Sequence, residues 1–127
     1  MNVLRVLLVE DDPLIGMMVA DMLEELGHDV SSIEVTEIAA VIAAARCKPD
    51  LMIVDARLGD GSGIFAVEEI LRAGFVPHLF MSGNISKVLS LRPDAVVLGK
   101  PFSETDLINA IQRARNVTDS PLIATRA

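Results

Sequence analysis

Cysteine and long apolar runs are scarce in this chain, and each absence excludes a class of protein. Cys47 is the only cysteine among 127 residues, so no disulfide can form within the chain. The apolar runs stay well below the ~18 residues of a membrane span, and the N-terminal stretch lacks the pattern of a secretory leader. We therefore expect a cytoplasmic protein that does not insert into a membrane.

Positive charge is also scarce. The formal net charge is -7 at pH 7, and the only three lysines, Lys48, Lys87 and Lys100, are scattered along the sequence. A surface that binds nucleic acid needs clustered lysine and arginine to contact phosphates. We therefore expect no direct contact with nucleic acid. The length suits one domain with one hydrophobic core.

Strand and helix signals alternate along the chain as far as about residue 116. Short apolar runs predict strands at residues 3–9, 28–33, 51–55, 78–81 and 95–98. Helical spacing and capping residues predict helices at 13–26, 38–46, 63–73, 85–91 and 104–116. This alternation predicts an α/β fold, a doubly wound five-stranded parallel sheet. Of the two common strand orders, the five-stranded one is 2-1-3-4-5.

One helical stripe contains methionine. Ile15, Met18, Met22 and Leu26 recur at helical spacing within residues 13–26. We expect this stripe to fill the core, because methionine is far more often a packing residue than part of a ligand site.

Acidic side chains stand at the ends of two predicted strands. Glu10, Asp11 and Asp12 follow the first strand, and Asp55 ends the third, "LMIVD". In the order 2-1-3-4-5 these strands are neighbours, so Glu10, Asp11 and Asp55 meet at the edge where such folds bind ligands. Two carboxylates ~4 Å apart repel by about 4 kcal/mol at an effective dielectric of 20, so the cluster needs a cation. Its all-oxygen donors suit Mg²⁺ or Mn²⁺ rather than Zn²⁺.

Two more polar residues end strands at the same edge. Ser82 ends the fourth predicted strand, and Lys100 follows the fifth. With the metal and Lys100 offsetting its charge, Asp55 is placed to attack a phosphoryl group and form an acyl phosphate. Ser82 would donate a hydrogen bond to the phosphoryl oxygen.

The motifs "LLVEDD", "LMIVDARL", "FMSG" and "LGKPF" occur in this order and at these distances. They resemble the response-regulator receiver domain of two-component signalling, over about residues 3–116. The resemblance implies a flavodoxin-like fold in which Asp55 is the phosphoacceptor. It implies that Asp11 is a direct metal ligand, that Glu10 acts through metal-bound water, and that the backbone carbonyl of Arg57 is a further ligand.

The same resemblance assigns Ser82 and Lys100 as the side chains that contact the phosphoryl group and switch the domain. It implies a histidine kinase or histidine phosphotransfer protein as phosphoryl donor, and a downstream protein as target. We expect residues 1–116 to form the receiver domain and residues 117–127 to form a tail without an output domain. The protein would then be a stand-alone phosphoacceptor and not an enzyme, beyond weak autodephosphorylation.

The sequence departs from the usual receiver pattern at two positions. Val97 occupies the place of the aromatic switch residue three before the lysine, and Gly59 replaces the proline four after the acceptor. The segment "PHLFMSGN" resembles a receiver subgroup that also lacks the aromatic residue. That subgroup is often single-domain and is paired in alphaproteobacteria with HWE-type kinases, which implies roles in phosphorelay or stress signalling.

Two other interpretations remain open. A haloacid-dehalogenase-type hydrolase also uses an aspartate nucleophile with Mg²⁺, but it needs a second aspartate where this chain has Arg57. A pseudo-receiver would keep the fold as a protein-interaction module without phosphotransfer. Loss of an acid, hydroxyl or lysine is the expected mark of a pseudo-receiver, and none is lost here.

Overall fold

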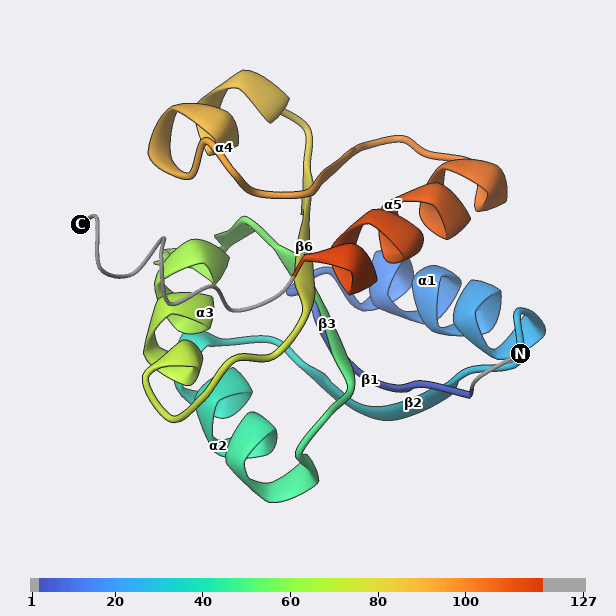
Figure 1. Cartoon of the computed structure of the whole chain (residues 1–127), viewed down its shortest axis with the longest axis horizontal. Helices are drawn as coiled ribbons and strands as arrows, with labels where there is room; N and C mark the ends of the chain where they lie inside the picture. The colour runs from blue at the N-terminus through green and yellow to red at the C-terminus, as the bar shows by residue number, and fades with distance from the viewer. Residues whose placement is uncertain (1–2, 118–127) are drawn as a thin grey trace.

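The computed structural model describes residues 3–117, and Figure 1 shows helices on both faces of its central sheet. The strands are parallel, in the order β2-β1-β3-β6-β7. Their bounds are β1 (Arg5–Val9), β2 (Asp29–Glu34), β3 (Leu51–Asp55), β6 (His78–Ser82) and β7 (Val97–Gly99). The helices within these residues are α1 (Pro13–Glu25), α2 (Glu37–Cys47), α3 (Gly63–Leu71), α4 (Ile85–Leu91) and α5 (Glu104–Asn116). The predicted fold and strand order are therefore confirmed, with β6 and β7 as the fourth and fifth strands of the sheet.

The core has two layers, one on each face of the sheet. Alternate residues of a strand point to opposite faces. Val6 and Leu8 of β1 pack with α1 and α5, whereas Leu7 and Val9 pack with α2 and α3. Because helices cover both faces (Figure 1), the central strands are apolar except at their ends, as is usual in parallel sheets.

Helix starts agree with the capping residues in the sequence. The Asp12 side chain accepts hydrogen bonds from the amides of Leu14 and Ile15 at the start of α1, at 2.9 and 3.3 Å. Ser103 and Asp106 form a reciprocal capping box at the start of α5. These contacts satisfy amides that have no partner inside the helix.

The prediction for the buried stripe of α1 is wrong at Met18, which is 55% exposed. The buried residues of α1 share a stripe one position away from the predicted one: Gly16, Val19, Ala20 and Leu23. Ile15, Met22 and Leu26 flank this stripe and are partly buried. The predicted helical spacing was therefore correct, but the predicted buried face was rotated by one residue. Gly16 and Ala20 face the sheet, and their small size makes them weak indicators of a buried face.

The glycine-rich segment after β3 has a regular structure of its own. It forms a two-stranded antiparallel hairpin, β4 (Arg57–Leu58) and β5 (Gly61–Ser62). Strand ends elsewhere differ from the predicted ones by one or two residues. Residues 118–127 lie outside the described part of the chain, so the expected tail is not tested. Among residues 3–117, no helix has both the length and the apolar character needed to cross a membrane.

Candidate functional site

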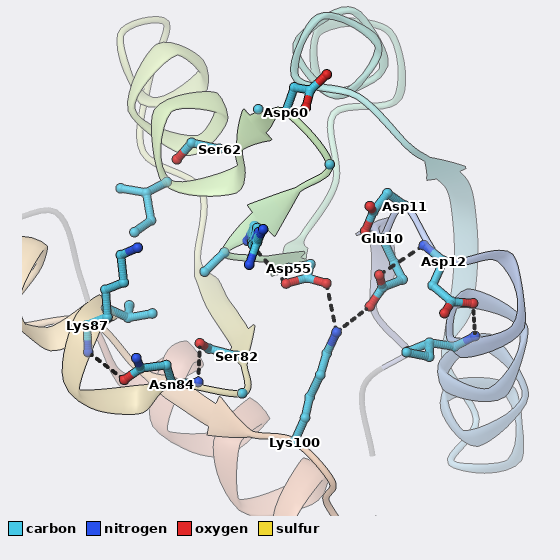
Figure 2. A pocket seen from close by; sticks show the side chains of 18 of the residues that line it. Glu10, Asp11, Asp12, Asp55, Asp60, Ser62, Ser82, Asn84, Lys87 and Lys100 are labelled. Atoms are coloured by element: carbon cyan, nitrogen blue, oxygen red, sulfur yellow. Dashed lines mark hydrogen bonds and ion pairs between the residues drawn. The ribbon is translucent and has the colours of Figure 1, made fainter.

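Three acidic side chains from two neighbouring strands meet at the carboxyl edge of the sheet (Figure 2). β1 pairs with β3 so that Val9 lies beside Val54, and the residues that follow, Glu10 and Asp55, emerge next to each other. Carboxylate oxygens of Glu10, Asp11 and Asp55 all lie within 4.8 Å of one another. Asp11 is exposed, whereas Glu10 and Asp55 are buried. The structure thus brings together acids that are 45 positions apart in the sequence.

Lys100 bridges two of these acids (Figure 2). Its Nζ donates to Asp55 Oδ2 at 2.7 Å and to Glu10 Oε1 at 2.8 Å. Burial alone would lower the pKa of Lys100. The hydrogen bonds to Asp55 and Glu10 outweigh this effect, so the pKa lies above its usual value. Lys100 is therefore charged, and it supplies one positive charge to a cluster that carries up to three negative ones.

Glu10 is the most buried member of the cluster, with 1% of its surface exposed. Burial raises its pKa to about 7, although the hydrogen bond from Lys100 opposes that shift. The Asp12 amide also donates to Glu10 Oε2, at 3.1 Å. A carboxylate that burial brings close to neutrality gains most from a nearby cation, because the cation offsets the solvation that the group has lost.

The backbone around Asp55 is packed too closely to move freely. Gly63, the first residue of α3, donates its amide to the carbonyl of Ala56 at 3.0 Å. A Cβ at Gly63 would collide with the Asp55 carbonyl oxygen and would lie 2.7 Å from Val54 Cγ1. Only glycine allows α3 to begin this close to the end of β3. The Asp55 side chain is held as well, since Oδ1 accepts from the Arg57 amide at 3.2 Å.

The β4–β5 hairpin forms one wall of the site. Arg57 lies in β4, next to the acid cluster, and its side chain is exposed. Gly59 at the turn has φ of 56°, and a Cβ there would lie 3.7 Å from Asp11 Oδ2. Proline fixes φ near −65°. The turn therefore has a different backbone from one that carries proline at this position.

Ser82 ends β6, on the far side of β3 from the acids of β1. It is 8% exposed, and its Oγ accepts a hydrogen bond from the Asn84 amide at 2.9 Å. Asn84 in turn caps α4 through its side chain, which accepts from the Lys87 amide. Ser82 is therefore linked directly to the start of α4, as Figure 2 shows.

Val97 occupies the place of the usual aromatic switch residue. It lies in β7 beside Phe80 and is partly buried. It packs against the cluster formed by β3, α2 and α3. No large ring occupies this position, so switching by aromatic rotation has no side chain to act through here.

The predicted site residues Glu10, Asp11, Asp55, Ser82 and Lys100 all line one open cleft of about 1040 Å³. Three oxygen donors at mutual distances below 4.8 Å, two of them buried, match the coordination preference of Mg²⁺ and Mn²⁺. The donor set therefore fits a divalent cation of this kind.

Two further residues were not singled out from the sequence. Lys87 lines the same cleft, on α4. Glu37, the first residue of α2, accepts a hydrogen bond from the Ser62 amide of the hairpin at 2.6 Å. No sequence pattern connects Glu37 with Ser62, because the two lie 25 positions apart and the contact depends on how α2 packs beside α3.

The fold and the site define a doubly wound α/β domain with an acidic, cation-compatible edge. Within that class, the model of the response regulator receiver domain matches residues 6–112, and this chain belongs to that family. Receiver domains of this family act as phosphoacceptors, bind Mg²⁺ through an acidic pocket, and interact with kinases and downstream proteins. The predicted family is confirmed.

Two curated relatives are similar over 114 residues. The phyllosphere-induced regulator PhyR of Methylorubrum extorquens is 35% identical, and the match covers 87% of this chain and 43% of PhyR. The transcriptional regulatory protein PdtaR of Mycobacterium tuberculosis is 38% identical, with 87% and 56% covered. The chain therefore spans about half the length of the curated relatives it matches.

A solved structure matches over nearly the whole chain. The solution NMR structure of the PhyR response regulator REC domain of Erythrobacter litoralis has a TM-score of 0.84 and 37% sequence identity. The match covers 94% of this chain and 95% of that chain. The similarity therefore includes the complete receiver unit.

Proposed function

We propose that this receiver domain accepts a phosphoryl group on Asp55 from a phosphohistidine, in a reaction that requires Mg²⁺ or Mn²⁺, and signals by changing which protein it binds. The observation that supports this most strongly is the arrangement of Asp55 beside Glu10, Asp11 and Lys100. A nucleophilic carboxylate next to a cation site and a fixed ammonium group suits attack on an anionic phosphoryl group.

In the proposed transfer, Asp55 attacks phosphorus, the new Oδ–P bond forms, and the N–P bond to the donor imidazole breaks. The imidazole leaves with the electron pair of that bond and takes a proton from solvent. Asp11, Asp55 and the backbone carbonyl of Arg57 would hold the metal directly, and Glu10 would act through a metal-bound water. The ion supplies electrostatic stabilisation of the phosphoryl oxygens when it is bound.

Lys100 and Ser82 have complementary roles in this proposal. Lys100 already donates to Asp55 Oδ2, so its charge is available where the phosphoryl charge develops. The Ser82 hydroxyl accepts from the Asn84 amide, and a hydroxyl that accepts one hydrogen bond can still donate another. That donor would be directed to a phosphoryl oxygen.

Movement of Ser82 toward the phosphoryl group would weaken its contact with Asn84, which caps α4. The start of α4 and the surface around β7 would then shift, and a protein partner would distinguish the two states. Coupling of this kind is typically about 1–3 kcal/mol. Because Val97 is not aromatic, the proposed route of switching is the hydrogen-bonded link from Ser82 through Asn84 to α4.

The proposed donor is an HWE-type histidine kinase or a histidine phosphotransfer protein, because residues 77–84 resemble the receiver subgroup that such kinases serve. We place the protein in the cytoplasm, where ATP-dependent kinases supply phosphohistidine. Residues 1–116 would act as the receiver, without contact to nucleic acid.

Labelling with acetyl phosphate tests the proposal. Intact-mass spectrometry should show one added phosphoryl group in Mg²⁺ and none in excess EDTA. Asp55→Asn should remove the label, whereas Asp60→Asn, which neutralises an exposed acid in the same cleft, should keep it. Absence of label on the parent protein in Mg²⁺ would favour the pseudo-receiver interpretation and refute the proposal.

A further inference from the structure

A carboxylate at the start of α2 contacts the backbone of the β4–β5 hairpin. Glu37 Oε2 accepts from the Ser62 amide at 2.6 Å, although the two residues lie in different elements. Gly61 makes room for this contact, because a Cβ at Gly61 would collide with Glu37 Oε2 and would lie 3.1 Å from its Cδ. The Glu37 carboxylate is thus packed directly against the hairpin backbone.

The pairing between the two hairpin strands is too short to hold the hairpin in place by itself. Each of its strands has two residues, and the pairs are Arg57 with Ser62 and Leu58 with Gly61. An isolated two-stranded hairpin of ordinary length is marginally stable in water, and a shorter one is less stable still. Gly59 at the turn adopts φ of 56°, so the turn is not restricted by proline. The side chain of Leu58 anchors β4 in the core, and the Glu37 contact adds a second anchor, at β5.

The position of the hairpin determines two features of the acid site. Arg57 is paired with Ser62, the residue that Glu37 holds, and the Arg57 amide donates to Asp55 Oδ1. At the other end, Gly59 lies close to Asp11 Oδ2. A hairpin that shifted by even part of an ångström would change the surroundings of two of the clustered carboxylates.

We propose that Glu37 is a positioning residue for the divalent cation site: by holding the Ser62 amide, it fixes the hairpin and so sets the place of Arg57 beside Asp55. This inference rests on the proposed function, because it assigns Glu37 to the same cation site. The contact occurs in a chain whose hairpin carries glycine at the position of the usual proline, so side-chain anchoring replaces backbone restriction.

Two effects of Glu37 have to be separated, its hydrogen bond and its charge. Glu37→Gln keeps an oxygen that can accept from Ser62 but removes the charge, whereas Glu37→Ala removes both. Gly61→Ala leaves Glu37 intact and displaces its carboxylate from the hairpin. Glu104→Ala is the matched control, since Glu104 is also an acid at the first position of a helix and is exposed.

The probe is Mn²⁺, measured by the loss of the free-ion signal in electron paramagnetic resonance. We expect Glu37→Ala and Gly61→Ala each to weaken Mn²⁺ binding by about tenfold, a typical effect for residues that orient metal ligands. Glu37→Gln and Glu104→Ala should stay within about twofold of the parent protein. In EDTA, hydrogen exchange at the Ser62 and Arg57 amides should be faster in Glu37→Ala.

Each outcome decides a different claim. Failure of the parent protein to bind Mn²⁺ would refute the proposed function. A parent that binds, together with Glu37→Ala of equal affinity, would refute the positioning role alone. If Glu37→Gln lost as much affinity as Glu37→Ala, the effect would be one of charge, and the positioning role would also be wrong.

Discussion

Replacing Lys100 by methionine tests how the acid cluster is stabilised when no divalent cation is bound. Lys100 Nζ donates to Asp55 at 2.7 Å and to Glu10 at 2.8 Å. Methionine retains most of the apolar stem but removes the ammonium group. The variant therefore leaves two buried carboxylates without their positive partner.

The expected loss follows from the burial of the three groups. Removing one partner of a buried ion pair costs about 3–5 kcal/mol. The Lys100 side chain is 22% exposed, whereas the side chains of Asp55 and Glu10 are 11% and 1% exposed. Because solvent screens the lysine in part, we expect a loss at the lower end of this range, about 3 kcal/mol. For a domain of this size that lowers Tm by about 10 °C.

The size of the loss depends on pH through Glu10. Burial raises the pKa of Glu10 to about 7 even with Lys100 in place, and removal of the ammonium raises it further. For a group whose pKa is raised by folding, stability is present below the usual carboxyl pKa and is lost as pH rises through the folded value. The part of the Lys100→Met deficit that comes from Glu10 should therefore be small below about pH 7 and should grow as the pH rises above that value.

Mg²⁺ should restore much of the lost stability, because the ion replaces the missing positive charge. A ligand at 100 times its Kd stabilises the folded state by about 2.7 kcal/mol. Removal of Lys100 also removes a like charge near the bound ion, so Mg²⁺ should raise the Tm of Lys100→Met more than that of the parent protein. Since the chain has no tryptophan or tyrosine, unfolding is best followed by far-ultraviolet circular dichroism.

Lys87→Met is the matched control. Lys87 lines the same cleft, is exposed, and carries the same charge. Its replacement should change Tm little and should leave the Mg²⁺ effect as in the parent protein. The reasoning is refuted if Lys100→Met in EDTA at about pH 8 has the same Tm as Lys87→Met, or if Mg²⁺ raises the Tm of both variants equally.

Three other changes test separate parts of the structure. Gly63→Ala should destabilise the fold by about 3 kcal/mol, because the new Cβ meets the fixed backbone of Asp55; Gly83→Ala, with open space around it, is the control in thermal melts, and equal Tm values would contradict the packing. Burial lowers the pKa of His78, so the folded state loses stability as the pH falls below the usual imidazole value of 6.5 toward the lower value in the fold. His78→Gln should reduce that acid destabilisation in denaturant titrations, and an unchanged pH profile would count against it. Ser82→Ala should slow acetyl phosphate labelling about 10- to 100-fold, the effect of losing one hydrogen bond to a charged group; an unchanged rate would remove Ser82 from the proposed transfer.

The sequence was informative about the acid cluster because parallel topology makes the position of strand ends predictable. Adjacent parallel strands finish at the same edge, so the strand order alone brings Glu10 and Asp11 near Asp55. Helix caps were predictable for a similar reason. Asp12 and Ser103 act on residues two or three positions away, within the reach of a local pattern.

The features that the sequence did not show depend on packing between distant segments. The phase of the α1 stripe was misjudged because Gly16 and Ala20, which have little or no side chain, face the sheet in place of Met18. The β4–β5 hairpin is too short for a periodic signal. Glu37, which contacts the hairpin, lies 25 positions before Ser62, so only the packing of α2 against the hairpin reveals the contact.

The central claim is that Asp55 and the carboxylates that follow β1 together hold one divalent cation. Anomalous diffraction from crystals soaked in Mn²⁺ tests this most directly. The account predicts a single strong peak within coordination distance of oxygens of Asp11 and Asp55. The Lys100 ammonium should not contact the ion. Absence of a peak at this edge of the sheet, or a peak coordinated by other residues, would contradict it.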